Sequence, residues 1–495
     1  MLSGQESEFF VGKRQKSALF FLRRLINTIF LPAAIVSDRI RKRIEPVAQG
    51  PAERALAPLG GFIFFISWGV VAISNTVGWV GYGIVIGLSI LAFLCAFIAS
   101  GRRLTHQRIS PAVMGYALVC CLTVFTSSFK LITLAAGALM MLTTVVGLML
   151  AVAFPLRQLM KIFSSTMLLI LAMSWLFEAF VSLVIRHPLA PLYMGSWSEV
   201  PPMYFWSNNE LLHGGPIQGI VANRNPLAFI ALLALLCVIV QYLDRQRSLV
   251  NALLWSGLSV LTLVFTRSAT VSVAAVACMI VLITGVIYRQ VSPAYKRRAK
   301  FIIIALALLA VVAALLGHSE ISALLGRDSD MTGRSEIWER VLALWRMRPI
   351  AGWGWTMVWI PWIPMFRYLV VHPDGTPTME AHNAWIEALF QTGVIGFAVL
   401  VLGMVWIAYK VYRTAFHQID TEPLVLLPAL LLTALLIQSL TESHLLYRGN
   451  WVLLCAIAGW LVIHVRESRV QSRREVGRYP LKGLVKSKGA EKSES

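Results

Sequence analysis

Long apolar stretches separated by short polar segments run along most of the chain. Twelve of them approach or exceed the length that crosses about 30 Å of hydrocarbon as an α-helix. They lie near residues 60–78, 81–99, 111–127, 131–153, 162–185, 226–243, 250–265, 268–288, 301–317, 386–409, 423–440 and 450–465. The pattern predicts an all-α, polytopic integral membrane protein of about twelve transmembrane helices.

The composition agrees with a membrane protein and excludes an ordinary soluble domain. Hydrophobic residues make up 57% of the 495 positions and charged residues 14%, whereas soluble domains carry about 25% charged residues. The pattern divides the chain into a basic segment (1–57), a transmembrane domain (58–465) and a basic tail (466–495). Residues 18–44 mix apolar and basic positions, as amphipathic helices on membrane surfaces do.

Positive charge marks one side of the membrane. Lysine and arginine follow every even-numbered apolar stretch, and both ends of the chain are basic. Because cytoplasmic loops carry an excess of these residues, we expect both termini in the cytoplasm. Residues 318–385 then form a large extracytoplasmic loop between the ninth and tenth stretches. The net charge of +20 follows from this topology and from anionic membrane lipids, so no nucleic acid is implied.

Cysteine and metal-binding patterns add no chemistry. The six cysteines lie inside apolar stretches, away from the outer loops where disulfides form. The chain has no Cys-x-x-Cys pair, no His-Glu-x-x-His helix and no glycine-rich phosphate loop. We therefore expect no metal site and no cofactor.

The first outer segment of interest ends where the sixth apolar stretch begins. Asn223, Arg224 and Asn225 directly precede Pro226. Proline suits the first turn of a helix, and a preceding asparagine suits its cap. Arg224 is less easily explained as structural, because a guanidinium at a helix N-terminus is suited to bind an anion.

Two further arginines lie on other outer segments. Arg267 occupies a tight turn between the seventh and eighth stretches, where the alternative is a side chain that reaches lipid headgroups. Arg334 lies in the 318–385 loop, just ahead of an amphipathic helix that we expect Ser335 to cap. On the outer face the topology rule does not account for a fixed cation, so both arginines are candidate anion ligands.

Tryptophans in the same loop have two interpretations. Trp338 and Trp353 stand among several others in a stretch rich in tryptophan and proline. Aromatic residues at this depth are typical of the interfacial belt. The alternative is a platform for sugars, whose C–H faces pack on indole rings.

His382 and Asn383 stand where the long loop enters the tenth stretch, and Gly393 and Gly396 follow. A histidine at a helix entrance is usually structural. Together with three outer arginines, however, it suggests a reaction: arginines hold a diphosphate without a metal, and an imidazole removes a proton from an attacking hydroxyl. The set favours glycosyl transfer from a lipid-linked diphosphate to an alcohol.

Glu178 is an ionisable residue inside the fifth apolar stretch. Charged groups in hydrocarbon are costly and often functional. We leave two interpretations open: a contact with an active-site arginine or acceptor hydroxyl, or a buried, hydrogen-bonded glutamate.

The outer motifs also resemble those of the O-antigen ligase and polymerase superfamily of bacterial envelope enzymes. The resemblance covers roughly residues 219–400, and the His-Asn-x9-Gly-x-x-Gly element is similar to the ligase signature. One departure is Thr266-Arg267-Ser268, where the family usually has Ser-Arg. The matching residues are Gly219–Asn225, Arg267, Ser268, Thr332, Gly333, Arg334, Ile337, Trp338, Pro349, Gly352, Gly354, His382, Asn383, Gly393 and Gly396.

The resemblance implies a glycosyltransferase in the bacterial inner (plasma) membrane, with residues 58–465 as the catalytic domain. A glycan would pass with inversion, and without a metal, from a polyprenyl (undecaprenyl) diphosphate carrier to an acceptor hydroxyl on the outer face. Arg267 and Arg334 would hold the diphosphate and His382 would be the base. The remaining expected substrate contacts are Arg224, Asn223, Asn225, Asn383, Glu178, Trp338 and Trp353.

Two other functions stay open at this point. A polymerase of the same superfamily would use similar residues to extend lipid-linked repeat units. A transporter or flippase would show interrupted helices and charges near the midplane, whereas the polar residues here gather in outer loops. The sequence does not specify the sugar, the oligomeric state or whether the acceptor is a glycolipid, a protein or a polysaccharide.

Overall fold

The computed structural model describes residues 50–195, 198, 200–296, 298, 330–371 and 375–478. Within these residues the chain is helical, with isolated β-bridges at Leu189–Ser207 and Val371–Pro377 and no strand. The predicted helix at 18–44 and the predicted span at 301–317 lie outside the described residues.

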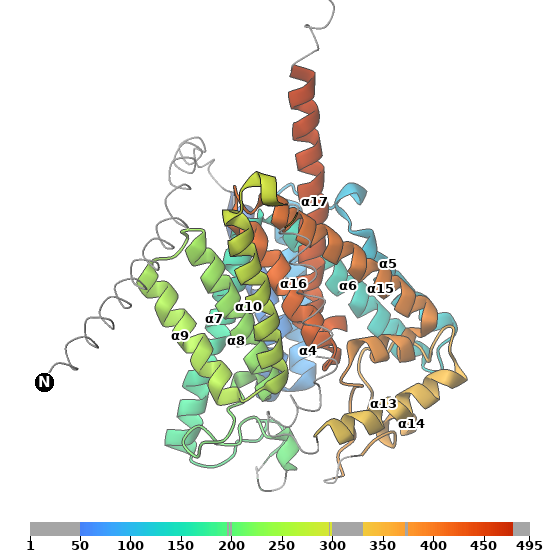
Figure 1. Cartoon of the computed structure of the whole chain (residues 1–495). Helices are drawn as coiled ribbons and strands as arrows, with labels where there is room; N and C mark the ends of the chain where they lie inside the picture. Colours follow the sequence, from blue (N-terminus) through green and yellow to red (C-terminus); the bar gives the residue numbers. More distant parts are fainter. Residues whose placement is uncertain are drawn as a thin grey trace, which may run out of the picture.

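α-Helices, most of them long, account for most of the described chain (Figure 1). Their bounds are α3 Pro51–Trp68, α4 Val70–Ala99, α5 Pro111–Leu122, α6 Lys130–Ala153, α7 Leu156–Phe180, α8 Arg224–Leu243, α9 Leu249–Thr266, α10 Ala269–Gln290, α13 Asp330–Met347, α14 Pro364–Arg367, α15 Ala384–Gln418, α16 Leu426–Ser439 and α17 Arg448–Arg478. Short turns of 3-10 helix include η2 Thr123–Phe125, η6 Gly219–Val221, η8 Pro423–Val425 and η9 Ser443–Leu446, and a π-helical turn, Val181–Ile185, extends α7.

Eight of the described helices are long and apolar enough to cross a membrane: α4, α6, α7 with its π-helical turn, α8, α9, α10, α15 and α17. Two shorter apolar helices, Pro111–Phe125 and Pro423–Ser439, lie where the sequence predicts further spans. The polytopic helical architecture is therefore confirmed, while the count of twelve spans stays a prediction.

The helix boundaries differ from the predicted ones at three places. The first break comes at Gly69, whose N–H bonds the Phe65 carbonyl, and not near residues 79–80. Gly78, with φ of 74°, is instead a kink inside α4. Ser335 lies inside α13, five residues after its start, so the prediction that it caps this helix is wrong. The basic tail also begins as helix, because α17 continues to Arg478.

Helices α8, α16 and α17 form the buried centre of the bundle. Helix α17 packs along α6, where Gly147 lets the two backbones approach closely. A Cβ on Gly147 would lie 2.5 Å from the Cys455 Cβ and 2.9 Å from the Val452 carbonyl oxygen. Small residues commonly allow such close packing between membrane helices.

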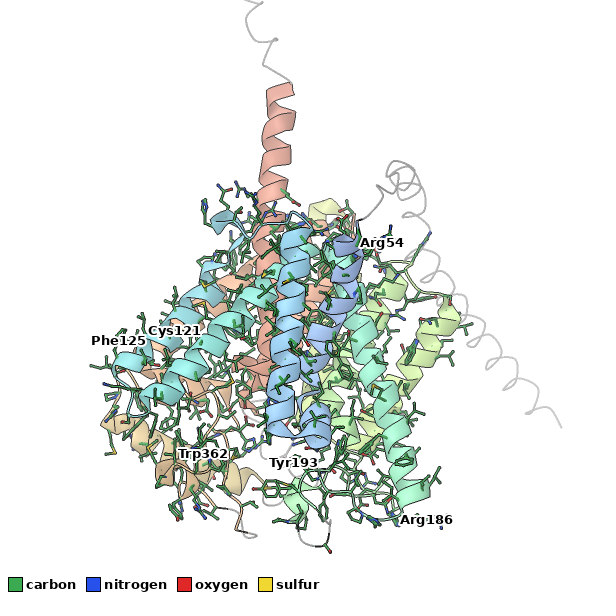
Figure 2. All side chains as sticks on the ribbon, turned by 180° about the vertical axis from the view of Figure 1, so that it is seen from behind. Arg54, Cys121, Phe125, Arg186, Tyr193 and Trp362 are labelled. Atoms are coloured by element: carbon green, nitrogen blue, oxygen red, sulfur yellow. The ribbon has the colours of Figure 1, made fainter. Side chains whose placement is uncertain are left out.

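The polar loops gather at one end of the bundle. Helices α13 and α14 and the loop after α7 lie at the end opposite the projecting part of α17 (Figure 1). The view from behind places Arg186, Tyr193 and Trp362 at this end and Arg54 at the other (Figure 2). We call the end that carries Arg186 the loop end.

Candidate active site

His382 lies at the loop end, on the turn that leads into α15. Asn383 caps the helix, because its side-chain oxygen accepts hydrogen bonds from the backbone N–H groups of Trp385 and Ile386. His382 itself has a left-handed backbone, with φ of 49°. The Trp338 indole N–H donates to the Ala381 carbonyl at 2.9 Å. The cap and this bond fix the direction in which the imidazole points.

Gly393, in the motif after His382, holds the long loop against α15. Gly393 has φ of 64° and interrupts the helix. A Cβ there would lie 2.2 Å from the Ile350 carbonyl oxygen. Across this close contact, Val394 N–H bonds the Pro349 carbonyl at 2.9 Å and Gly354 N–H bonds the Gln391 carbonyl at 3.0 Å. The motif therefore fastens the loop that carries α13 onto the helix that follows His382.

Two carboxylates flank the His382 imidazole. Its Nδ1 lies 3.2 Å from Glu380 Oε1 and 3.2 Å from Glu442 Oε2. The imidazole is partly exposed, at 31%, whereas the Glu442 side chain is 6% exposed. Because Nδ1 faces the carboxylates, Nε2 lies on the opposite edge of the ring.

Glu442 connects four segments of the chain. Besides His382, its carboxylate lies 3.4 Å from Arg334 Nη2 and accepts a hydrogen bond from Asn225 Nδ2 at 3.2 Å. Asn225 Oδ1 in turn accepts from the Ser268 hydroxyl at 2.9 Å. The network thus joins the starts of α8 and α10, helix α13 and the cap of α15. We call these five residues, Asn225, Ser268, Arg334, His382 and Glu442, the Glu442 network.

Glu380 is held from its other side. The Tyr447 hydroxyl donates to it, and His444 Nε2 lies 3.9 Å from its Oε2. Burial opposes the charge on this carboxyl, but His444 and His382 hold its pKa well below the usual range. Glu380 therefore stays ionised beside His382.

The environment also changes the proton affinity of His382. Burial alone would lower the pKa of the imidazole, but its hydrogen bonds to Glu380 and Glu442 raise that pKa to about 10. At neutral pH the resting His382 is consequently protonated. The imidazole becomes a base only in its neutral form.

The other predicted arginines lie close to the network in sequence. Arg267 ends α9 in a left-handed conformation, with φ of 48°. Its side chain is exposed, while its neighbours Thr266 and Ser268 are buried. Arg224 is the first residue of α8 and is half-buried. Ser268 belongs to the Glu442 network, so Arg267 emerges beside it.

Asn223 has a local role at the start of α8. Its side-chain oxygen accepts a hydrogen bond from Asn225 N–H at 2.9 Å, which caps the helix as predicted. The cap orients Asn225, whose side-chain amide lies between Ser268 and Glu442. The two asparagines therefore have different roles: Asn223 caps the helix, and Asn225 belongs to the Glu442 network.

Glu178 fastens an outer loop to α7. It is buried, and its carboxylate accepts hydrogen bonds from the Ser207 hydroxyl at 2.9 Å, Gln218 N–H at 2.9 Å and Gly219 N–H at 2.6 Å. These bonds hold the loop that leads to Asn223. A contact between Glu178 and a substrate stays a prediction.

Trp353 contributes to the packing of the loop. Its indole N–H donates to the Leu344 carbonyl at 2.9 Å, and the Arg348 guanidinium lies 4.4 Å above its ring. The first contact joins the loop to α13, and the second packs Trp353 against the residue that directly follows this helix. Its predicted role as a sugar platform, like that of Trp338, stays a prediction.

A further buried glutamate, Glu387, holds together the two segments that carry His382 and Glu442. Glu387, in the first turn of α15, accepts hydrogen bonds from Ala381 N–H at 2.6 Å and from the Trp359 indole N–H at 2.8 Å. The Ser443 hydroxyl also donates to it, at 3.3 Å. Glu387 thereby ties the segment before His382 to the segment after Glu442.

Three of these groups are close enough together to share one metal ion. Glu380, His382 and Glu442 each offer a ligand atom within 4.8 Å of the others. The two carboxylates are already paired with cationic side chains: both lie beside His382, and Glu442 also pairs with Arg334. These ion pairs balance the negative charge of the cluster.

Sequence analysis missed both carboxylates that flank His382. Glu380 precedes His382 by two residues, and Glu442 stands in the short polar connection between the predicted eleventh and twelfth spans. Both positions are polar residues at the outer ends of apolar stretches. The sequence shows these positions, but it does not indicate that the fold brings them next to His382.

Comparison with known proteins agrees with this geometry. Residues 252–401 match the sequence model of a family described as O-antigen ligase. The matched stretch contains Arg267, Arg334 and His382, whereas Asn225 and Glu442 lie outside it.

A curated relative points to the same superfamily. The exopolysaccharide production protein ExoQ of Rhizobium meliloti (strain 1021) is 26% identical to this chain in an alignment 218 residues long, which covers 42% of this chain. The chain spans 50% of the length of that relative. The match to the O-antigen ligase family, the similarity to this relative and the apolar helices together support a multi-pass membrane protein that is similar to the O-antigen ligase and polymerase superfamily.

Proposed function

We propose that the protein transfers a glycan from a polyprenyl diphosphate carrier to an acceptor hydroxyl, with inversion and without a metal. The observation that carries the proposal is the Glu442 network. It brings a base candidate, His382, and an anion ligand, Arg334, to the same buried carboxylate. Arg267 emerges beside it, and all three residues lie in the stretch that matches the O-antigen ligase family.

The proposed reaction takes place on the outer face of the bacterial inner membrane. The positive-inside rule assigns the loop end to that face and both termini to the cytoplasm. The polyprenyl chain of the donor would lie in the membrane beside the helices, with its diphosphate near Arg267 and Arg334. Bidentate bonds from guanidinium groups match diphosphate oxygens.

The bond changes balance without a cofactor. The acceptor oxygen bonds to the anomeric carbon, and the bond from that carbon to the diphosphate oxygen breaks on the opposite face. The electron pair leaves with the polyprenyl diphosphate, whose added charge the two arginines stabilise. The acceptor proton passes to Nε2 of neutral His382, the ring nitrogen turned away from the carboxylates.

Glu380 and Glu442 act on the reaction through His382. A carboxylate at Nδ1 fixes the tautomer and the orientation of the ring, and it stabilises the imidazolium formed when the base takes a proton. Glu442 additionally holds Arg334, so base and anion ligand keep a fixed spacing. Both glutamates are positioning residues in this mechanism.

The test is transfer by the purified protein in detergent. A polyprenyl-diphosphate oligosaccharide is supplied with candidate acceptors, with and without EDTA, and the products are separated by mass. We expect glycan on a non-carrier acceptor at the same rate in EDTA. A rate abolished by EDTA and restored by one divalent cation would contradict the metal-independent mechanism and assign the ion to Glu380, His382 and Glu442.

The relative favours one second candidate function. Its name refers to exopolysaccharide production, which fits a polymerase that extends lipid-linked repeat units. The assay above separates the two, because a polymerase lengthens the carrier-bound chain while a ligase transfers the chain to another acceptor. Absence of any transfer with carrier-linked glycans would return the transporter to consideration.

A further inference from the structure

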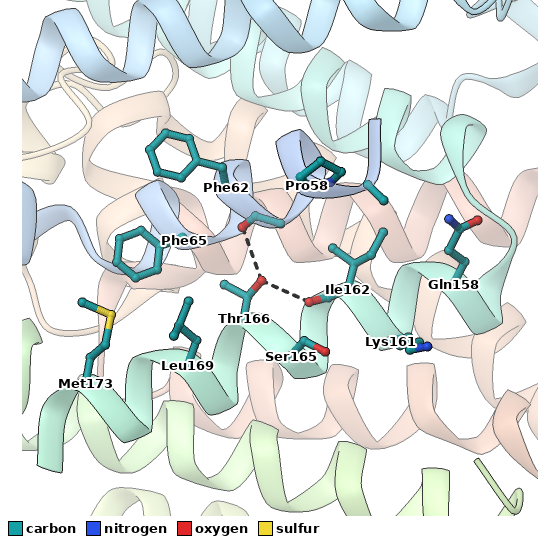
Figure 3. A pocket seen from close by; sticks show the side chains of 12 residues that line it. Pro58, Phe62, Phe65, Gln158, Lys161, Ile162, Ser165, Thr166, Leu169 and Met173 are labelled. Atoms are coloured by element: carbon teal, nitrogen blue, oxygen red, sulfur yellow. Dashed lines mark hydrogen bonds between the residues drawn. The ribbon is translucent and has the colours of Figure 1, made fainter. Parts of the chain in front are cut away.

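A groove of about 700 Å³ lies between α3 and α7, away from the Glu442 network (Figure 3). Its volume falls within the range of about 300–1,000 Å³ that is typical of small-ligand sites. It opens on the side of the bundle, where the lining residues Phe62 and Leu169 are exposed.

The walls of the groove are apolar. Phe62 and Phe65 of α3 stack with their ring centroids 6.2 Å apart, and Leu169 and Met173 line the facing side of α7. The Thr166 hydroxyl lies 3.3 Å from the Gly61 carbonyl oxygen and 3.0 Å from the Ile162 carbonyl oxygen. Because its hydrogen bonding is satisfied within the wall, the occupant that suits this part of the groove is a hydrocarbon chain.

One end of the groove is polar and basic. Gln158 and Lys161, in the first two turns of α7, line this end. Lys161 is exposed and forms none of the ion pairs found among the described residues. Because α7 begins here and ends near Arg186 at the loop end (Figure 2), Lys161 lies on the cytoplasmic side of the proposed topology.

The length of the groove corresponds to one membrane leaflet. Between Lys161 and Met173 the helix rises about 18 Å at about 1.5 Å per residue. One leaflet contributes about 15 Å, half of the hydrocarbon core of about 30 Å. A lipid whose headgroup lies at Lys161 would therefore extend its acyl chain along the groove to about the midplane.

We propose that this groove binds a phospholipid of the cytoplasmic leaflet, with an acyl chain between α3 and α7 and an anionic headgroup at Lys161. The charge of Lys161 favours an anionic headgroup, and the apolar walls favour an acyl chain. A carrier polyprenyl phosphate shares the phosphate but has a chain much longer than this groove. The site is independent of the proposed transfer reaction.

The test is lipid binding to the full-length protein in detergent, followed by native mass spectrometry during titration with phosphatidylglycerol or phosphatidylcholine. The wild type should bind its first phosphatidylglycerol more tightly than its first phosphatidylcholine. Lys161→Gln should reduce this preference about five-fold, the effect of one basic residue near an anionic lipid surface.

A second variant tests the groove itself. Gly61 lines the groove and a Cβ there has ordinary contacts, at 3.6 Å from Ile162 and Thr166, so the side chain of Gly61→Leu should occupy part of the groove. It should weaken the first binding event at least ten-fold for both lipids. Gly87→Leu is the matched control, because a Cβ at that exposed position of α4 meets nothing within 4 Å.

Three results would overturn the proposal. The first is equal affinity for the two lipids in the wild type. The second is binding by Gly61→Leu that equals that of Gly87→Leu. The third is displacement of phosphatidylglycerol by polyprenyl phosphate at a lower concentration than by phosphatidylglycerol itself, which would assign the groove to the carrier lipid.

Discussion

At the scale of single residues, the central feature is an imidazole between two carboxylates. Glu380 and Glu442 both lie 3.2 Å from His382 Nδ1 and hold the pKa of the imidazole at about 10. A base with this pKa is strong but is rarely in its neutral form: at pH 7 only about one imidazole in a thousand is neutral. The same pairing that orients His382 therefore limits how often it acts.

The first prediction is a pH dependence of transfer. The neutral fraction of His382 rises about ten-fold per pH unit up to its pKa, so kcat/KM should increase from pH 7 towards pH 10. Glu442→Gln removes one of the two carboxylates that raise the pKa, so the rising limb should move to lower pH in the activity that remains. The measurement is the pH profile of both proteins.

The control for this profile is Glu336→Gln, which removes an exposed carboxylate paired with Arg340. Its profile should match that of the wild type. A rising limb at the same pH in Glu442→Gln would show that Glu442 does not set the proton affinity of the base.

The second prediction concerns the shape of the Arg334 side chain. A lysine keeps the charge but loses the planar fork that binds two oxygens. We expect Arg334→Lys to lower kcat/KM by at least ten-fold. Arg340→Lys, on the exposed side of the same helix, should retain wild-type activity, and equal rates for the two variants would refute a bidentate contact at Arg334.

At the scale of elements, the kink of α15 explains why glycine follows His382 at a fixed distance. Gly393 has a backbone that other residues avoid, and Ile350 occupies the space that a side chain would need. Sequence analysis predicted the span that forms α15 from its run of apolar residues, but it assigned Asn383 to substrate contact and did not foresee that this residue caps the helix. It misplaced the first helix break, since both Gly69 and Gly78 interrupt an apolar run and only tertiary packing distinguishes a chain reversal from a kink.

The third prediction follows from this kink. Gly393→Ala should destabilise the protein by about 1–3 kcal/mol or more, the cost of a strained backbone residue. It should also reduce transfer, because the added methyl group pushes the segment that follows α13, and with it Arg334, away from α15. Thermal unfolding and activity are measured together. Gly87→Ala, at an open helical position, should be neutral or stabilising, and wild-type stability in Gly393→Ala would contradict the assigned backbone.

At the scale of the whole molecule, the helices bring together residues that lie far apart in the chain. Glu442 is separated from Asn225 by 217 residues, from Arg334 by 108 and from His382 by 60. Sequence analysis found the three partners because each lies at a helix start or in a motif. It missed Glu442 because a polar residue between two apolar stretches looks like an ordinary connection until the bundle closes.

The fourth prediction tests the proposed orientation of the bundle. Tyr193 lies at the loop end and is exposed, whereas Gln290 ends α10 at the other end and is exposed there. A membrane-impermeant maleimide should label Tyr193→Cys in intact spheroplasts and Gln290→Cys only after permeabilisation. The reversed pattern would place the Glu442 network in the cytoplasm and exclude an outer-face reaction.

The most direct measurement is the rate of glycan transfer by purified His382→Ala beside His417→Ala. His417 is an exposed histidine in the last turn of α15, at the opposite end of that helix from His382. The proposed mechanism predicts that His382→Ala inserts and folds normally but transfers at least about 100-fold more slowly, the usual contribution of a general base, while His417→Ala matches the wild type. Transfer by His382→Ala at the wild-type rate would contradict the assignment of this site as the catalytic centre.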